Sequence, residues 1–272
     1  PLVASLLVFA LLAFMNYVRE QADRRQIRNA FSRYLAPEVV DRLSDNPDRL
    51  RLGGEMRDMT LLFSDVQGFT GIAENYDAVG LTRLINEILT PITAEVLRTG
   101  GTVDKYMGDA VMAFWNAPVD DADHARNACR AALAIQAAKA PLNAHLAAQA
   151  AEEGHPFVPV NFGVGVNTGE CCVGNMGSDM RFDYSVLGDA VNLASRLEGQ
   201  TRTYGVGIVV GEETRRQARD LAMLELDLVR VKGKTVPVRI FALLGDETLY
   251  PRLALRQRQA GRAAAPLRAA AA

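Results

Sequence analysis

The sequence predicts a mixed α/β (α+β) domain over residues 53–247, because strand-like and helix-like patterns alternate along this stretch. Residues 59–66 form a nearly continuous apolar run, which is typical of a buried central strand. Between Leu81 and Val96, leucine, isoleucine and valine recur at three- and four-residue intervals, which predicts a long amphipathic helix. Pro91 should bend this helix without ending it, because the apolar pattern continues past the proline.

The remaining patterns complete a recognisable order of elements. Two short apolar runs, residues 102–107 and 110–114, are joined by a Gly-Asp turn and predict a hairpin. Helices are expected over residues 122–138 and 189–200, and further strands over 160–167, 170–173, 182–187, 206–210, 224–232 and 236–243. Strand, helix, hairpin, helix and strand is the order of a ferredoxin-like βαββαβ core, here with strands appended. Such a sheet should carry helices on one face and leave the other face for a partner.

The N-terminal segment differs in composition from this domain. Residues 2–15 carry no charge, and the apolar run continues to Val18. A helix of this length spans roughly 25 Å, close to the hydrocarbon thickness of a bilayer. Residues 1–18 are therefore interpreted as the C-terminal part of a transmembrane helix, with a signal peptide and a buried core helix as alternatives. Arginines follow directly, which places the main domain in the cytoplasm.

Two further segments flank the domain. Residues 19–52 are predicted to form a juxtamembrane helical linker, because residues 19–36 are strongly charged and carry an apolar stripe at helical spacing. The stripe suits pairing with a second copy of the chain and packing on its own domain equally well. Residues 248–272 are rich in alanine and arginine with little apolar periodicity, so we expect a disordered tail.

Charge and cysteine content exclude several functional classes. The net charge of -2 gives no reason to expect nucleic-acid binding. Three cysteines and three histidines are too few and too scattered for a disulfide framework or a zinc site.

Two aspartates occupy positions where chain geometry exposes a carboxylate. Asp65 ends the first strand, and Asp109 lies at the tip of the hairpin. The first strand and the hairpin are neighbours in a βαββαβ sheet, so the two carboxylates can converge. Hard oxygen ligands without histidine or cysteine favour Mg²⁺ or Mn²⁺. The spacing alone leaves an alternative open, in which Asp65 caps the following turn and Asp109 suits a tight hairpin.

Three motifs carry a family resemblance. They are residues 63–70 (FSDVQGFT), 105–110 (KYMGDA) and 188–196 (GDAVNLASR). In this order they resemble the class III adenylate/guanylate cyclase catalytic domain, and the match runs from about Arg33 to Leu243. A membrane helix, a short linker and this domain together resemble bacterial membrane-bound receptor-type adenylate cyclases. The resemblance implies an enzyme in the cell inner membrane that converts ATP into cyclic AMP and pyrophosphate.

The same resemblance implies roles for the two aspartates and for a helical pair. Asp65, Asp109 and the backbone carbonyl of Val66 would hold two Mg²⁺ or Mn²⁺ ions. Asn192 would orient the ribose, and Arg196 would stabilise charge on the α-phosphate. Residues four apart on a helix share one face, which agrees with a joint role for Asn192 and Arg196.

Base and phosphate recognition are implied in the same way. Lys105 matches the family's base-selecting lysine, where guanylate cyclases usually carry glutamate. Ser185 occupies the second base-selecting position, where many members have aspartate. A hydroxyl can donate as well as accept, so selectivity for ATP should be softer with serine. Lys232 matches the lysine that contacts the terminal phosphates, and Lys234 is the second candidate.

A homodimer follows from the same resemblance. In this family one subunit supplies the metal aspartates, and the other supplies the base-selecting, transition-state and phosphate residues. The chain carries both sets, so two copies would form two equivalent sites. Two alternatives stay open, a guanylate cyclase and a catalytically inactive regulatory or dimerisation module. The Gly-Gly-Asp/Glu-Glu-Phe loop of diguanylate cyclases is absent.

Overall fold

The computed structural model describes residue 15 and residues 53–154, 156–178, 181–230, 237–246 and 248–249. The predicted transmembrane segment apart from Met15, the linker, and nearly all of the C-terminal tail lie outside these residues. Within the described part of the chain, no helix combines the length and the apolar character needed to cross a membrane.

The described residues form two compact units. The smaller one groups residues 174–184 with those up to Gly54, and it consists of extended strand ends. The larger one comprises Glu55–Val173 and the residues from Ser185 onward. Every candidate site residue that the structure describes lies in the larger unit.

Thirteen elements follow one another in the described residues. They are β1 (Gly53–Val66), α3 (Phe69–Ala73), α4 (Ala78–Arg98), β2 (Thr102–Met107), β3 (Ala110–Trp115), α5 (His124–Glu153), β4 (Phe162–Ser178), β5 (Arg181–Leu187), α6 (Asp189–Tyr204), β6 (Ile208–Gly211), α7 (Glu212–Gln217), β7 (Ala222–Val229) and β8 (Val238–Gly245). The strands form a sheet in the order β2-β3-β1-β4-β6-β8-β7, with β5 paired to β4. The order β4-β1-β3-β2 is that of a ferredoxin-like core, so the predicted mixed fold with appended strands is confirmed.

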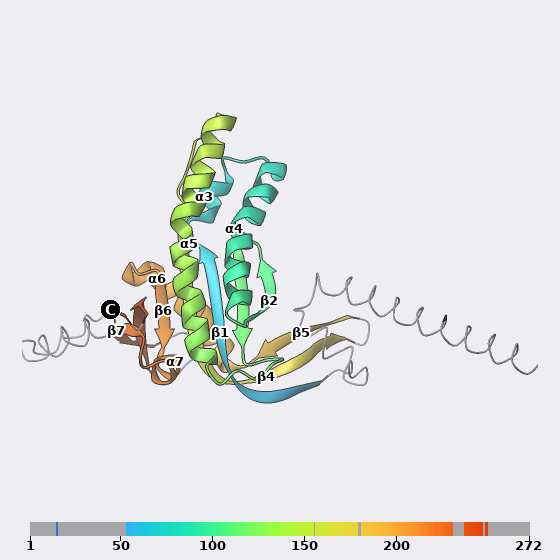
Figure 1. Ribbon diagram of the computed structural model, residues 1–272, viewed down its shortest axis with the longest axis vertical. Coiled ribbons are helices and arrows are strands. Elements are labelled where there is room, and N and C mark those ends of the chain that lie inside the picture. The colour runs from blue at the N-terminus through green and yellow to red at the C-terminus, as the bar shows by residue number, and fades with distance from the viewer. Residues whose placement is uncertain are drawn as a thin grey trace, which may run out of the picture. The chain divides into compact units, whose positions relative to one another are not determined.

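Helices cover both faces of this sheet. The helices α4 and α5 run side by side (Figure 1) and pack with Ile208 and Val210 of β6 in the main hydrophobic core. Val209 between them packs instead with Leu193 and Leu197 of α6. Successive side chains of a strand point to opposite faces, so α6 lies on the other face from α4 and α5. The expectation of helices on one face only is therefore wrong.

Two predicted boundaries differ from the structure. Residues 160–173 were expected to form a hairpin turning at Thr168 and Gly169, whereas β4 runs through both residues without a break. Thr168 is buried and hydrogen-bonded inside the sheet, and Gly169 has no positive φ, so neither residue has the features of a turn. The helix α5 extends to Glu153 with Pro141 inside it, well beyond the predicted end at residue 138.

Glycine in β4 lets α6 approach the sheet closely. A Cβ atom at Gly165 would collide with the carbonyl oxygen of Ala194 and the amide of Glu198, both backbone groups of α6. Neither group can move independently of the helix. Gly165 therefore sets the height of α6 above the sheet, and with it the position of the side chains on that helix.

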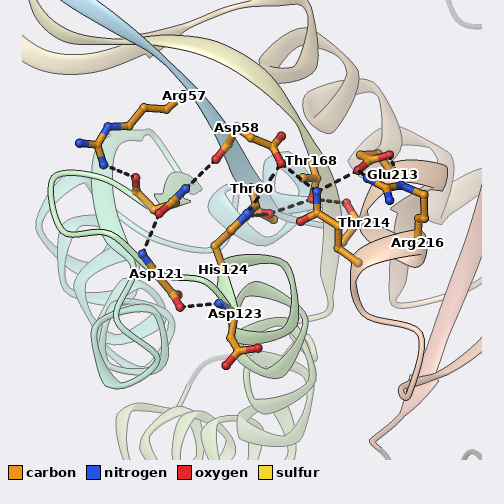
Figure 2. A network of polar contacts seen from close by, with 12 residues as sticks. Arg57, Asp58, Thr60, Asp121, Asp123, His124, Thr168, Glu213, Thr214 and Arg216 are labelled. Carbon is orange, nitrogen blue, oxygen red and sulfur yellow. Dashed lines mark hydrogen bonds and ion pairs between the residues drawn. The ribbon is translucent and has the colours of Figure 1, made fainter.

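A chain of buried hydroxyl groups and one histidine links four elements of the larger unit (Figure 2). The Oγ1 of Thr60 in β1 lies 2.8 Å from His124 Nδ1 and 2.7 Å from Thr168 Oγ1. Thr168 Oγ1 in turn lies 2.8 Å from Thr214 Oγ1 in α7. Each of these buried polar side chains therefore has a hydrogen-bond partner, and the hydrogen bonds link β1, β4, α5 and α7 to one another.

His124 should make the stability of the domain depend on pH. Burial lowers the pKa of His124 below its ordinary value of 6.5. Four surrounding carboxylates act in the opposite direction, those of Asp58, Asp121, Asp123 and Glu213. Because the folded chain binds this proton less readily than the unfolded chain, stability is present above pH 6.5 and is lost as the pH falls through the lowered pKa.

We expect His124→Asn to reduce this dependence, because asparagine keeps a polar atom near Thr60 without a titrating ring. The stability advantage of the unaltered chain, measured by urea unfolding, should shrink from pH 7.5 to pH 5. The decrease should be about 1.4 kcal/mol for each unit by which the pKa is lowered. An advantage of equal size at both pH values would contradict the prediction.

Candidate active site

The structure brings the two predicted metal aspartates together. The strands β1 and β3 are antiparallel neighbours, and Ser64 of β1 pairs with Val111 of β3. The next residue of β1, Asp65, therefore lies beside the turn that carries Asp109. Gly108 before it has a φ of 69°, a left-handed conformation that suits glycine in a tight turn. The carboxylates of Asp65 and Asp109 are close enough for the negative charge of Asp109 to raise the pKa of Asp65.

The environment of Asp65 favours a bound cation. Burial raises the pKa of Asp65, the negative charge of Asp109 raises it further, and the nearby Arg202 opposes both effects. Two adjacent carboxylates with an excess of negative charge and only oxygen donors fit Mg²⁺ or Mn²⁺. Val66 follows Asp65 directly as the last residue of β1. Among the described residues, no set of three or more histidine, cysteine and acidic side chains is arranged to hold a metal ion.

Two charged residues of α6 complete this cluster, and neither was predicted. Arg202 donates from Nη2 to Asp65 Oδ2 over 2.8 Å. The Oε1 atom of Glu198 is buried without a hydrogen-bond partner. Burial raises the pKa of Glu198, and the charge of Asp65 adds to this effect. The four-residue spacing of Glu198 and Arg202 was visible in the sequence, but the predicted helix ended at residue 200, before Arg202.

The two predicted base-selecting residues also meet, through a third residue. Ser185 Oγ donates to Asp104 Oδ2 over 2.8 Å, and Lys105 Nζ lies 3.2 Å from Asp104 Oδ1. The Asp104 side chain is 0% exposed, whereas that of Lys105 is 46% exposed. Burial raises the pKa of Asp104, while the hydrogen bond from Ser185 and the positive charge of Lys105 oppose this effect.

An irregularity in β2 explains why Asp104 was missed. Regular alternation would send the side chains of Asp104 and Lys105 to opposite faces. The pairing of β2 with β3 shifts register between Val103 and Lys105, however. This bulge leaves Asp104 unpaired in the ladder, and its carboxylate contacts both Lys105 and Ser185.

The predicted transition-state pair, Asn192 and Arg196, lies on a different side of α6 from the two charged residues next to Asp65. Asn192 is exposed, and its one side-chain hydrogen bond within the described part of the chain goes to the carbonyl of Gly188, at 3.5 Å. Arg196 forms no hydrogen bond or ion pair within the described part of the chain. At 3.6 residues per turn, Asn192 and Arg196 lie roughly 120° around the helix from Glu198 and Arg202.

The buried stripe of α6 separates these two pairs. It consists of Leu193, Ala194, Leu197 and Thr201. One flank of the helix therefore faces the metal aspartates of its own chain, and the other flank carries Asn192 and Arg196. The two phosphate-binding candidates, Lys232 and Lys234, lie outside the described residues.

Comparison with known proteins assigns the family. A family model described as the adenylate and guanylate cyclase catalytic domain matches residues 54–245. The chain belongs to this family. Adenylate cyclase 1 of Rhizobium meliloti is 34% identical over 190 residues, 70% of this chain and 28% of that protein. An adenylate cyclase of Anabaena cylindrica is 31% identical over 238 residues, 85% of this chain and 45% of that protein. The cyclase chain thus spans less than half the length of these curated relatives.

Solved cyclase structures resemble the chain as well. The adenylyl cyclase CyaB from P. aeruginosa has a TM-score of 0.66 and 34% identity, covering 72% of this chain and 97% of that one. The guanylyl cyclase Cya2 has a TM-score of 0.64 and 31% identity, covering 72% and 95%. An adenylyl cyclase and a guanylyl cyclase thus resemble this chain at similar sequence identity. Similarity alone therefore does not distinguish ATP from GTP as the substrate of this cyclase chain.

Proposed function

We propose that this chain is the catalytic part of an adenylate cyclase, which converts ATP into 3′,5′-cyclic AMP and pyrophosphate. The cluster of Lys105, Asp104 and Ser185 carries the choice of ATP. The exposed ammonium of Lys105 can donate to the N1 acceptor of adenine, and the oxygen of Ser185 can accept from the adenine amino group. Guanine presents an N1–H donor instead of an N1 acceptor, which does not match the ammonium of Lys105.

The reaction would proceed at the aspartate cluster. Asp65, Asp109 and the Val66 carbonyl would hold two Mg²⁺ or Mn²⁺ ions. When bound, such ions neutralise phosphate charge and activate the ribose 3′-hydroxyl. The 3′-oxygen would attack the α-phosphorus and give its proton to water, and the bond from this phosphorus to the β-phosphate oxygen would break to release pyrophosphate. Electrostatics and positioning supply most of the rate enhancement in such transfers.

The other candidate residues would position the nucleotide and balance its charge. Asn192 would orient the ribose, and Arg196 would stabilise the negative charge that develops on the α-phosphate. Lys232, or Lys234 in its place, would contact the terminal phosphates. These roles agree with the free flank of α6, where Arg196 forms no ion pair with any described residue.

We further propose that two copies of the chain share each site. The flank of α6 with Asn192 and Arg196 is turned away from the metal aspartates of its own chain, so a second subunit would supply the complementary half. Exposed apolar side chains near the base-selecting residues suit such an interface. They are those of Tyr106, Met107 and Leu187, which are 50%, 43% and 63% exposed.

The membrane anchor is a proposal supported by the sequence alone. The apolar residues 1–18, followed by arginines, would place the helix in the cell inner membrane with the catalytic domain in the cytoplasm. Insertion would also fix the relative orientation of two neighbouring catalytic domains.

Product analysis tests the proposed activity. The purified chain is incubated separately with ATP and GTP in the presence of Mn²⁺ or Mg²⁺, and the cyclic product is identified by mass spectrometry. We expect cyclic AMP, with a higher kcat/KM for ATP than for GTP. A preference for GTP would identify a guanylate cyclase, and the absence of any cyclic product would favour an inactive regulatory module.

A further inference from the structure

The hydroxyl group of Ser185 presents a problem for base recognition. A serine hydroxyl carries one proton and two lone pairs, so it can act as donor or acceptor. A free hydroxyl would accept from the amino group of adenine and donate equally well to the O6 of guanine. Serine at this position should therefore weaken discrimination, unless something in the protein fixes the direction of its hydrogen bond.

The neighbouring carboxylate fixes that direction. Ser185 Oγ lies 2.8 Å from Asp104 Oδ2, with the serine as donor. An ionised carboxylate can only accept, so the single proton of Ser185 must point at Asp104. Lys105 Nζ, 3.2 Å from the other carboxylate oxygen, favours the ionised form. The lone pairs of Ser185 are then its only remaining hydrogen-bonding capacity.

We propose that Asp104 is a positioning residue for nucleotide selection, which makes Ser185 an acceptor-only partner for the amino group of adenine. The proposal rests on the proposed function, because it assumes that a purine base binds at Ser185 and Lys105. Asp104 itself does not touch the base. It acts through Ser185, and the two residues together do what a carboxylate at position 185 would do directly.

Burial makes this arrangement specific. The Asp104 side chain is 0% exposed, so water does not compete for the proton of Ser185, and Ser185 itself is only 7% exposed. Hydrogen bonds in such surroundings discriminate strongly, because a mismatched polar group stays unsatisfied. Guanine O6 would face the lone pairs of Ser185 with no proton between them. We therefore expect the site to bind a purine with a 6-oxo group less well than one with a 6-amino group.

The substitution Asp104→Asn reverses the polarity of this contact while keeping its shape. The ammonium of Lys105 attracts the amide oxygen to the Oδ1 position, which turns the amide NH₂ toward Ser185. The amide then donates to Ser185 Oγ, and the serine proton becomes free to point at the base. We expect the variant to lose its preference for the amino group and to accept a 6-oxo group more readily.

The test compares ATP with purine riboside triphosphate, which lacks the 6-amino group but keeps N1, and with inosine triphosphate, which carries a 6-oxo group. In full-length D104N we expect the kcat/KM ratio of ATP to purine riboside triphosphate to fall roughly tenfold. The ratio of inosine triphosphate to ATP should rise. D227N, which alters a β7 carboxylate bonded to Tyr204, is the matched control and should leave both ratios unchanged.

Two further variants separate a positioning role from a structural one. Ser185→Ala should lose the same preference for the amino group, and D104N should add no further loss in that background. The double variant D104N/S185D should regain the preference, because the carboxylate introduced at position 185 accepts both from the amide introduced at position 104 and from adenine. This rescue keeps the proposal testable where D104N alone folds poorly.

Equal losses on ATP and purine riboside triphosphate in D104N, with no rescue by S185D, would overturn the proposal. Such losses would assign Asp104 to holding Lys105 or the strand. The unaltered chain is assayed first, which separates failure of the proposed cyclase activity from failure of the proposed role of Asp104. If it makes no cyclic AMP, the proposed function fails; if it makes cyclic AMP but D104N keeps the amino-group preference, only the inference about Asp104 fails.

Discussion

Replacing Asp65 with asparagine is expected to abolish cyclase turnover while raising the stability of the metal-free domain. Turnover should fall roughly 10³-fold, equivalent to about 4 kcal/mol of transition-state stabilisation, because a ligand of both proposed ions is lost. The stability gain follows from the repulsion between Asp65 and Asp109. Burial and the charge of Asp109 raise the pKa of Asp65 despite its bond to Arg202, so the ionised form is disfavoured in the folded chain.

The size of this stability change depends on pH. Because the folded-state pKa of Asp65 lies above its ordinary value of 3.8, its contribution to stability is favourable below that value and is lost as the pH rises through the raised pKa. At pH 7.5 in EDTA, thermal unfolding of Asp65→Asn should therefore occur at a temperature about 2–4 °C higher, equivalent to about 1 kcal/mol. The difference should shrink toward pH 4.

Metal addition provides the control for this prediction. Mn²⁺ should raise the unfolding temperature of the unaltered chain, because a ligand that binds only the folded state stabilises it, and it should have little effect on Asp65→Asn. Asp109→Asn removes the other half of the pair and should behave in the same way. A variant that keeps its turnover, or that becomes less stable in EDTA at pH 7.5, would contradict the proposed role of this pair.

Local patterns in the sequence were sufficient to predict the core of the fold and the proximity of Asp65 and Asp109. The apolar run that ends at Asp65 and the glycine turn before Asp109 are signals contained within a few residues. The strand order then brings both aspartates to one end of the sheet without further information. Pro91 lies inside α4, as predicted, because the apolar stripe on both sides of it packs on the sheet.

Features that depend on distant partners could not be predicted in this way. The local sequence predicts a turn at Thr168. In the structure its hydroxyl forms hydrogen bonds with Thr60 and Thr214, which are far away in the sequence. Regular strand alternation places Asp104 on the face opposite to Lys105. The bulge in β2 changes this direction, and the Asp104 carboxylate accepts a hydrogen bond from Ser185. In each case a long-range polar contact overrides the local pattern, and the sequence alone does not indicate which contact forms.

The proposed sharing of sites between two chains predicts that two inactive variants restore activity when combined. Asp65→Asn destroys the metal half of a site, and Arg196→Ala removes the charge that stabilises the α-phosphate. In a mixed dimer, one site carries both defects, and the other site carries neither. Random mixing gives half mixed dimers with one intact site of two, so about a quarter of the unaltered activity should return. The measurement is cyclic AMP formation after the two chains are co-expressed or refolded together.

The matched control combines two defects in the same half of the site. Asp65→Asn mixed with Asp109→Asn leaves every site of every dimer with a damaged metal pair, so no activity should return. This contrast follows directly from α6, which turns Glu198 and Arg202 toward its own aspartates and turns Asn192 and Arg196 away from them. Recovery in both mixtures would contradict the placement of Asp65 and Asp109 in the same half of a site. Recovery in neither would mean that each chain builds its site alone. In that case α6 would have to rotate by about a third of a turn to bring Arg196 to Asp65.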